Sequence, residues 1–264
     1  MRLEKANTIV RLDVFLVDKK LASSRTQAQE LILLGYVFLK KLEKETILKK
    51  SSYLVQDSEQ DFIFIKSNEI QKYVSRGGLK LEQALKKIQL KLKSKIVLDI
   101  GQSTGGFTDC LLQSDVEKVV GIDVGHSQLH ENIKSNFKVV FFENVHVKDL
   151  KTHLNFKESV PSAGFDLIVA DVSFISLTKV IPHISPFLKK GGDYLLLVKP
   201  QFELSKKELD KNGIVKNPKG YALVKNQIED VARLCFGDVI SYFESETLGK
   251  DGNQEFFIYG QRSK

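Results

Sequence analysis

Four ionisable side chains stand beside predicted strands and helices, where α/β folds bind their ligands. Asp171 follows the apolar run 167–170, Lys199 follows 194–198, Glu255 precedes 256–260, and Lys80 lies near the start of a helix. In open α/β sheets the ligand sits at the carboxyl ends of the strands, so we expect Asp171 and Lys199 in one crevice. An amine beside a carboxylate can orient or accept a proton, so this crevice predicts proton-assisted group transfer.

A glycine-rich turn leads from the apolar run 96–100 into a helix, with the sequence Gly101-Gln102-Ser103-Thr104-Gly105-Gly106-Phe107. Glycines let the backbone approach a ligand and leave the helix N-terminus facing it. About 20 residues later Asp123 ends another apolar strand, where a carboxylate can accept hydrogen bonds from ribose hydroxyls. We predict a nucleoside cofactor contacted by Gly101, Ser103, Gly105, Phe107, Asp123 and Val124.

The identity of that cofactor depends on the pattern of the glycines. The turn lacks the G-x-G-x-x-G pattern of nicotinamide-dinucleotide folds. With Asp99 two residues before Gly101, it resembles motif I of S-adenosylmethionine-binding proteins instead. A nicotinamide cofactor and a purely structural turn are the two alternatives.

The elements that must position these residues alternate between strand-like and helix-like segments, as in a parallel sheet covered by helices. The predicted strands are 96–100, 118–122, 139–142, 167–170, 194–198, 239–244 and 256–260. We expect an α/β, Rossmann-like doubly wound sheet over residues 77–264, a linker at 67–76, and a small α+β domain at 1–66.

The amino-terminal segment carries most of the positive charge. Residues 1–56 contain eleven Lys/Arg and six Asp/Glu, in a chain with a net charge of +7, which favours a polyanionic partner such as nucleic acid. Leu12, Phe15 and Leu16 have helical spacing. Ser23 and Ser24 offer the cap of a second helix, and Gly35 suits the left-handed conformation that ends it.

This segment resembles the αL RNA-binding domain of small-subunit ribosomal protein four. The residues that carry the resemblance are Arg11-Leu12-Asp13-x-x-Leu16, Ser23-Ser24-Arg25-x-x-Ala28 and Leu31-Ile32-x-x-Gly35-x-Val37. The resemblance implies that Arg11, Arg25 and Lys41 contact RNA phosphates, which position an RNA without reading its sequence. Where the family has a Val-Asn-Gly turn, this chain has Leu39-Lys40-Lys41. The alternative is a solvated basic helical hairpin.

The whole chain resembles the TlyA family, known as haemolysins and as ribosomal RNA 2′-O-methyltransferases, whose catalytic domain is related to the FtsJ-type ribose methyltransferases. The shared motifs are Ser-Thr-Gly-Gly-Phe-Thr-Asp, Asp-Val-Gly-x-x-Gln-Leu, Asp-Val-Ser-Phe-Ile-Ser and Val-Lys-Pro-Gln-Phe-Glu. The resemblance implies S-adenosylmethionine as the methyl donor, no metal, and cytidine in ribosomal RNA or a ribosomal subunit as the target. The family has Asn and Arg where this chain has His146 and Lys148, so we assign no role to these two.

The family's catalytic tetrad maps onto Lys80, Asp171, Lys199 and Glu255. A ribose hydroxyl is a poor nucleophile and must approach the methyl group in line. Lys199 would be its base or orienting donor, and Asp171 would hold Lys199. Lys80 and Glu255 would orient the hydroxyl. Alignment alone is worth several kcal/mol in such reactions.

The remaining features weigh against other classes of protein. The longest apolar runs have about five residues against the roughly 20 that span a bilayer, and the start shows no secretory signal. Cys110 and Cys235 alone cannot form a disulfide framework and fit a reducing cytoplasm. His126 and His130 lack the Glu of H-E-x-x-H, so we interpret them as surface helix residues.

Three rival functions stay open at this stage. The first is a membrane-active haemolysin and the second is a non-catalytic RNA-binding protein with a vestigial cofactor fold. The third is a base methyltransferase, which would use an Asn-Pro-Pro-Tyr-like or cysteine motif that Asp171-Val172-Ser173-Phe174 does not match. The modified nucleotide and the oligomeric state are not predicted.

Overall fold

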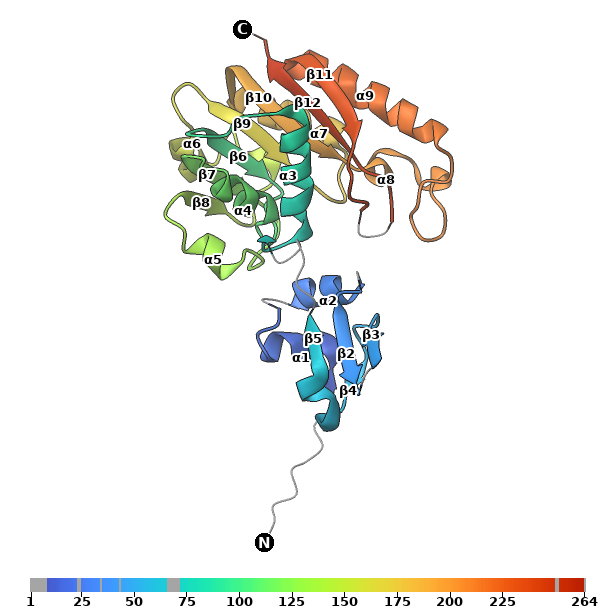
Figure 1. Cartoon of the computed structure of the whole chain (residues 1–264). Helices are drawn as coiled ribbons and strands as arrows, with labels where there is room; N and C mark the ends of the chain where they lie inside the picture. Colours follow the sequence, from blue (N-terminus) through green and yellow to red (C-terminus); the bar gives the residue numbers. More distant parts are fainter. Residues whose placement is uncertain are drawn as a thin grey trace. The chain divides into compact units, whose positions relative to one another are not determined.

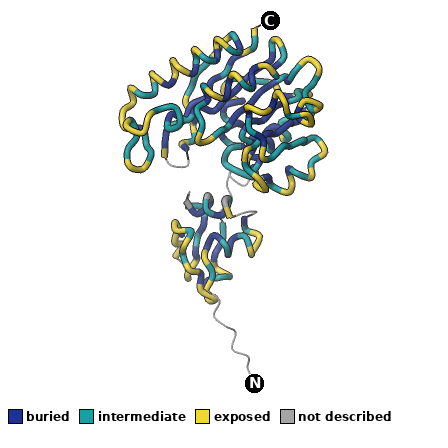
Figure 2. Tube along the Cα trace, turned by 180° about the vertical axis from the view of Figure 1, so that it is seen from behind, coloured by how far each residue is buried: buried dark blue, intermediate teal, exposed yellow. Residues whose placement is uncertain are grey.

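The structure is a computed structural model that describes residues 9–22, 25–33, 35–42, 44–65, 72–249 and 252–263. The chain divides into two compact units, Met1–Ser75 and Arg76–Lys264 (Figure 1). The division falls inside the segment 67–76 that we predicted as a linker, and the predicted domain boundaries stay a prediction. Each unit has a buried interior of its own with exposed loops around it (Figure 2).

The first unit combines helices with short antiparallel strands. The elements are α1 (Leu12–Asp18), α2 (Arg25–Leu33), β1 (Val10–Arg11), β2 (Val37–Lys41), β3 (Lys44–Ile47), β4 (Leu54–Val55), a 3-10 helix (Asp57–Phe62) and β5 (Ile63–Ile65). β2 pairs with β3 and β5, and β1 pairs with β4. Leu12, Leu16 and Ile32 are fully buried where α1 packs on α2. The predicted apolar stripe of α1 is therefore the face that packs against α2.

Two turns of this unit can be compared with the predictions made from the sequence. Gly35 follows α2 with a φ of +77°, the left-handed conformation predicted for it. Lys41 faces Lys44 in the β2–β3 ladder, so a hairpin forms without the family's Val-Asn-Gly turn. Leu42 supplies the positive φ, +54°, that a tight hairpin connection needs. The predicted caps Ser23 and Ser24 lie outside the described residues.

The second unit is built on a sheet that has seven strands in the described part of the chain, in the order β11-β12-β10-β9-β6-β7-β8. The strands are β6 (Ile96–Ile100), β7 (Lys118–Ile122), β8 (Val139–Phe142), β9 (Phe165–Ala170), β10 (Leu188–Val198), β11 (Gly237–Glu244) and β12 (Phe256–Arg262). β8, β7, β6, β9 and β10 are parallel, and β12 lies antiparallel between β10 and β11. The predicted doubly wound sheet is confirmed.

Helices cover this sheet on both faces. They are α3 (Arg76–Ile88), α4 (Gly106–Gln113), α5 (Glu131–Lys134), α6 (Leu154–Ser159), α7 (Leu177–Ile184), α8 (Pro200–Glu203) and α9 (Lys219–Cys235), with 3-10 turns at Val147–Asp149, Ser185–Phe187 and Lys206–Glu208. Leu98 and Ile100 of β6 join the core formed with α7 and α9. Val97 is equally buried and, by strand alternation, faces the other side, where α3 packs on α4. No helix in the described ranges has the length and apolar character to cross a membrane.

Candidate active site

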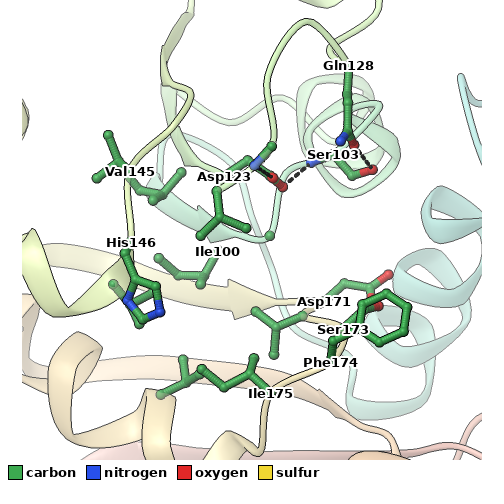
Figure 3. Close-up of a pocket in the computed structure, with 17 residues that line it drawn as sticks. Ile100, Ser103, Asp123, Gln128, Val145, His146, Asp171, Ser173, Phe174 and Ile175 are labelled. Atoms are coloured by element: carbon green, nitrogen blue, oxygen red, sulfur yellow. Dashed lines mark hydrogen bonds between the residues drawn. The ribbon is translucent and has the colours of Figure 1, made fainter.

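A cavity of about 610 Å³ opens at the carboxyl ends of β6, β7 and β9 (Figure 3). Its lining consists of Ile100, Gly101, Ser103, Ile122, Asp123, Val124, Gly125, Gln128, Val145, His146, Val147, Asp171, Val172, Ser173, Phe174, Ile175 and Val180. Val145 and His146 lie on the opposite side of the cavity from Asp171, Ser173 and Phe174. A largely apolar wall with a few polar groups at one edge is typical of a small-molecule site.

Gly101 begins the turn after β6 and brings that turn against the end of β9. Its φ is +81°, and a Cβ added to it would lie 2.5 Å from the carbonyl oxygen of Asp171. The amide of Asp171 also donates to the carbonyl oxygen of Ile100 at 2.9 Å. Only glycine combines that φ with so close an approach, so the cavity floor and the backbone of Asp171 are in direct contact.

Asp123 forms the polar edge of the cavity. Its Oδ2 accepts a hydrogen bond from the amide of Ser103 at 2.8 Å, and its Oδ1 accepts one from the amide of Gly125 at 2.6 Å. Ser103 in turn donates from Oγ to Oε1 of Gln128 at 3.1 Å, so the carboxylate and the turn are held together (Figure 3). The carboxylate at the end of β7 is therefore fixed before any ligand binds.

A buried polar chain lies beneath the glycine turn. Thr108 Oγ1 donates to Asp99 Oδ2 at 2.7 Å, and Gln102 Nε2 donates to Thr108 Oγ1 at 2.8 Å. Complete burial raises the pKa of Asp99 to about 7; the charges of Asp171 and Asp123 add to the rise, and the hydrogen bond from Thr108 opposes it. The chain links the end of β6 to α4 and stiffens the base of the turn.

The strand register brings three of the predicted catalytic residues to one edge of the sheet. Ala170 pairs with Leu196, and Val198 pairs with Phe256, so the residues that flank these pairs adjoin at the ends of β9, β10 and β12. They are Asp171, Lys199 and Glu255, which are consecutive with Ala170, Val198 and Phe256.

Lys199 and Asp171 form a close ion pair. Lys199 Nζ lies 2.6 Å from Asp171 Oδ1 and donates a hydrogen bond to Ser173 Oγ at 2.9 Å. Oδ1 is buried, and among the described residues its partner is the Lys199 ammonium. The pair is therefore a close ionic contact.

Lys80 and Glu255 form a second pair, which is nearly inaccessible to solvent. Lys80 Nζ donates to Glu255 Oε2 at 2.5 Å, and the side chains are 9% and 3% exposed. α3 carries Lys80 on its buried side, and Gly249 lies so close to the Glu255 carboxylate that a Cβ there would be 2.6 Å from Oε1. Two lysines and two acids thus form two pairs, and only Asp171 of the four lines the cavity.

An exposed aromatic side chain borders the Lys199–Asp171 pair. Phe174 is 90% exposed and has a φ of +63°, a conformation that is unusual for a bulky residue. Its ring lies 5.1 Å from that of Phe202, over which Lys199 Nζ lies at 6.0 Å. An exposed ring beside a polar pair offers a flat apolar surface at the mouth of the cavity.

Comparison with known proteins identifies the family. The FtsJ-like methyltransferase family matches residues 73–262, and the S4 domain matches residues 10–39. The chain belongs to the TlyA family of FtsJ-like methyltransferases. It is 36% identical to Hemolysin A of Brachyspira hyodysenteriae, covering 95% of this chain and 99% of that protein.

Another TlyA relative and a solved structure extend this comparison. The chain is 35% identical to the 23S rRNA (cytidine-2′-O)-methyltransferase TlyA of Campylobacter jejuni, covering 95% of this chain and 98% of the relative. The crystal structure of a protein described as a hemolysin from Lactococcus lactis matches with a TM-score of 0.67 and 37% identity, covering 73% of this chain and 89% of that one.

The cofactor contacts predicted from the glycine-rich turn and the strand that ends at Asp123 separate into two groups. Gly101, Ser103, Asp123 and Val124 line the cavity, whereas Gly105 and Phe107 do not. Gly105 is the N-cap of α4, where a Cβ would be 2.9 Å from Leu129, and Phe107 is buried inside. Gln128, Ser173 and Phe174 line the cavity although we did not predict it; all three stand within the family motifs, which was the available signal.

His146, His126 and His130 differ in their relation to the cavity. His146, to which we assigned no role, lines the cavity, and its Nδ1 accepts from the amide of Lys148 at 3.1 Å. The prediction that His126 and His130 lie on a surface helix is wrong, because His126 is in a loop and His130 is the N-cap of α5. Within the described ranges no group of three or more His, Cys, Asp or Glu could hold a metal ion.

In the S4 unit, each of the three cations predicted to bind RNA contacts a buried carboxylate. Arg11 Nε and Arg25 Nη2 lie 3.0 and 3.1 Å from Asp13, and Lys41 Nζ lies 2.8 Å from Glu59. The hydrogen bond from Arg11 is the main reason why the pKa of Asp13 is held far below its usual range. The three cationic side chains are 47%, 60% and 63% exposed, so each is anchored yet accessible.

Proposed function

We propose that this protein methylates the 2′-hydroxyl of a cytidine in ribosomal RNA, with S-adenosylmethionine as the methyl donor. The relative from Campylobacter jejuni is named for that reaction on 23S rRNA and is similar over nearly its whole length. The observation that carries the proposal is the Lys199–Asp171 pair, 2.6 Å apart, at the border of the cavity. The ribosomal substrate would place its work in the cytoplasm.

The cavity fits the adenosine part of this cofactor. Asp123 presents an anchored carboxylate that can accept hydrogen bonds from two ribose hydroxyls. Val124, Val145 and Val147 provide an apolar wall suited to a purine ring. When bound, S-adenosylmethionine supplies an electrophilic methyl group on a positively charged sulfur. The turn at Gly101 brings this part of the cavity against Asp171.

Lys199 is the residue best placed to act on the target hydroxyl. Its amine is held by Asp171 and Ser173 and stands at the end of a buried strand, which fixes its position. From there it can donate a hydrogen bond that orients the hydroxyl oxygen, and in its neutral form it can accept the hydroxyl proton. Asp171 offsets the charge of the amine through Oδ1, which lies 2.6 Å from Nζ.

Lys80 and Glu255 act as a rigid second pair behind the first. Because both are nearly inaccessible, the pair gives a charge distribution that does not rearrange during the reaction. We propose that it orients the hydroxyl and tunes Lys199, its neighbour across the β10–β12 ladder. Positioning of this kind supplies much of the rate when the reactants are pre-aligned.

The S4 unit supplies affinity for the RNA. Arg11 and Arg25 are held by one carboxylate, so two guanidinium groups are fixed side by side with part of their surface free. Fixed guanidinium groups suit phosphates because less conformational entropy is lost on binding. We propose that Arg11, Arg25 and Lys41 contact the phosphate backbone of ribosomal RNA or of a ribosomal subunit.

Mass spectrometry of ribosomal RNA from cells with and without the gene tests the function directly. The expected result is loss of one or a few 2′-O-methylcytidines, restored by the wild-type gene and not by Lys199→Ala. Methylation on a base atom, or no change in either subunit, would contradict the proposal. Lysis of lipid vesicles by the purified protein without RNA or methyl donor would favour a haemolysin instead.

A further inference from the structure

Glu203 joins the two segments that carry the Lys199–Asp171 pair. Its Oε1 accepts a hydrogen bond from the amide of Leu177 at 2.8 Å, and its Oε2 accepts one from Ser176 Oγ at 2.5 Å. Ser176 lies five residues after Asp171, and Glu203 lies four residues after Lys199. The carboxylate therefore bridges the segment that follows β9 and the segment that follows β10.

The two segments meet at three levels. At the first, Lys199 contacts Asp171 and Ser173; at the second, the rings of Phe174 and Phe202 lie 5.1 Å apart. Glu203 makes the third, where one segment leaves a helix and the other enters one: α8 ends at Glu203 and α7 begins after Ser176. A bridge at this point holds the end of α8 and the start of α7 at a fixed distance from each other.

The carboxylate is not needed to cap α7 in the ordinary way. Ser176 is already the N-cap and accepts a hydrogen bond from the amide of Thr178 at 3.1 Å. Glu203 accepts a hydrogen bond from another amide in the first turn of α7, that of Leu177. It does so from a different segment of the chain. Its contacts are thus long-range, whereas helix caps usually come from the adjoining residues.

Glu203 is half-buried. Burial raises the pKa of the Glu203 carboxyl, while the hydrogen bonds from Ser176 and Leu177 and the charge of Lys179 lower it. The charge of Glu203 also adds to the effect of burial in raising the pKa of Tyr242. A half-buried carboxylate whose two oxygens both bridge the segments that carry Asp171 and Lys199 suggests a task beyond stability.

We propose that Glu203 is a positioning residue, whose bridge to Ser176 and Leu177 holds Lys199 at its working distance from Asp171. The inference rests on the proposed methyl transfer. Glu203 acts through Lys199 and does not itself contact the reacting atoms. A displacement of a catalytic group by about 1 Å can lower a rate about 100-fold, so loss of the bridge acts on kcat.

Two substitutions distinguish the effect of the hydrogen-bond bridge from the effect of the negative charge of Glu203. Glu203→Ala removes both contacts and should lower kcat at least about tenfold, with KM for S-adenosylmethionine within about twofold. Glu203→Gln keeps both contacts, because its amide oxygen can accept from Leu177 and its NH₂ can donate to Ser176 Oγ. It should retain kcat within about threefold, because the bridge survives.

Glu208 provides a matched control. Its Oε2 also accepts from a backbone amide and a serine hydroxyl, those of Ser205, both at 2.9 Å, but these contacts are local. Glu208→Ala should leave kcat unchanged. If Glu203→Ala does not fold, Ser176→Ala removes only one of the two contacts and should give an intermediate loss of kcat.

A chemical readout keeps this inference separate from the proposed function. The rate at which Lys199 is acylated by acetic anhydride, followed by peptide mass spectrometry, reports how firmly the amine is held and needs no RNA. Glu203→Ala should raise that rate several-fold, and Glu203→Gln should not. If the wild-type protein is inactive on ribosomal RNA but the acylation rates differ in this way, the proposed function is contradicted. The positioning role of Glu203 is then still supported. Wild-type kcat and acylation rate in Glu203→Ala, or equal damage from Ala and Gln, would overturn the positioning role.

Discussion

The carbonyl oxygen of Asp171 occupies the space that a side chain on Gly101 would need, 2.5 Å from the position of its Cβ. The glycine turn after β6 and the carboxyl end of β9 therefore share one contact surface. A substitution at Gly101 should alter both the cavity and the Lys199–Asp171 pair.

Gly101→Ala should lower both cofactor affinity and stability. The added Cβ must displace the backbone of Asp171, and φ at +81° costs an alanine about 1–3 kcal/mol. We expect at least a tenfold loss in affinity for S-adenosylhomocysteine by calorimetry, and a lower melting temperature. Gly191→Ala is the control: its φ is +70° but nothing lies within 4 Å, so stability should fall and affinity should not.

Lys199→Ala should abolish methyl transfer and leave cofactor affinity nearly intact, because Lys199 does not line the cavity. The rate of methyl transfer is measured with tritiated methyl groups and ribosomal subunits, and the cofactor affinity is measured by calorimetry. Lys189 pairs with Asp166 across β10 and β9 at the opposite end of these strands. Lys189→Ala should therefore keep full activity, and measurable turnover by Lys199→Ala would contradict the assigned role.

Arg25→Gln should weaken RNA binding and reduce its dependence on salt. Removal of one phosphate contact lowers the slope of log K against log salt by about 0.7–0.9. Filter binding of ribosomal RNA between 50 and 200 mM salt, as typical conditions, measures this. Lys50, an exposed lysine of the same unit, serves as the control. Equal losses for Lys50→Gln would indicate a diffuse basic surface rather than the anchored Arg11–Arg25 pair.

Asp99 should make the stability of the second unit depend on pH. Its pKa is raised to about 7 in the folded protein, above the value of about 4 of an unfolded aspartate. Between these values the folded state binds more protons, so the free energy of unfolding falls as pH rises from about 4 to 7 and then levels off. Asp99→Asn should lack this slope in urea titrations at pH 5, 6 and 8. The same slope in the variant would assign the effect to another group.

The sequence predicted the places of the proposed catalytic residues better than their partners. Apolar runs predicted the carboxyl ends of β9 and β10, which carry Asp171 and Lys199. The contact of Lys80 with Glu255 joins residues 175 positions apart, and it follows from the antiparallel insertion of β12, which periodicity does not encode. Phe107 was predicted to contact the cofactor, but it is the second residue of α4 and lies on the side of that helix that faces the core.

The anchoring of Arg11 and Arg25 by Asp13 and the bridge made by Glu203 were missed for a related reason. Each depends on a side chain that reaches from one element to another: Arg25 to Asp13, and Glu203 to Ser176. Local patterns show which face of an element is buried. They do not show which polar groups meet there, because that depends on how elements pack in three dimensions.

The insertion of β12 between β10 and β11 has a consequence for synthesis of the protein. A nascent chain that ends before Glu255 already contains β6 to β10 and the residues that line the cavity. We expect it to leave a gap between β10 and β11 and to offer the Lys80 amine no carboxylate to meet. We therefore expect the cofactor-binding domain to take shape before the proposed catalytic centre is complete, and methylation to begin only when the last described strand closes the sheet.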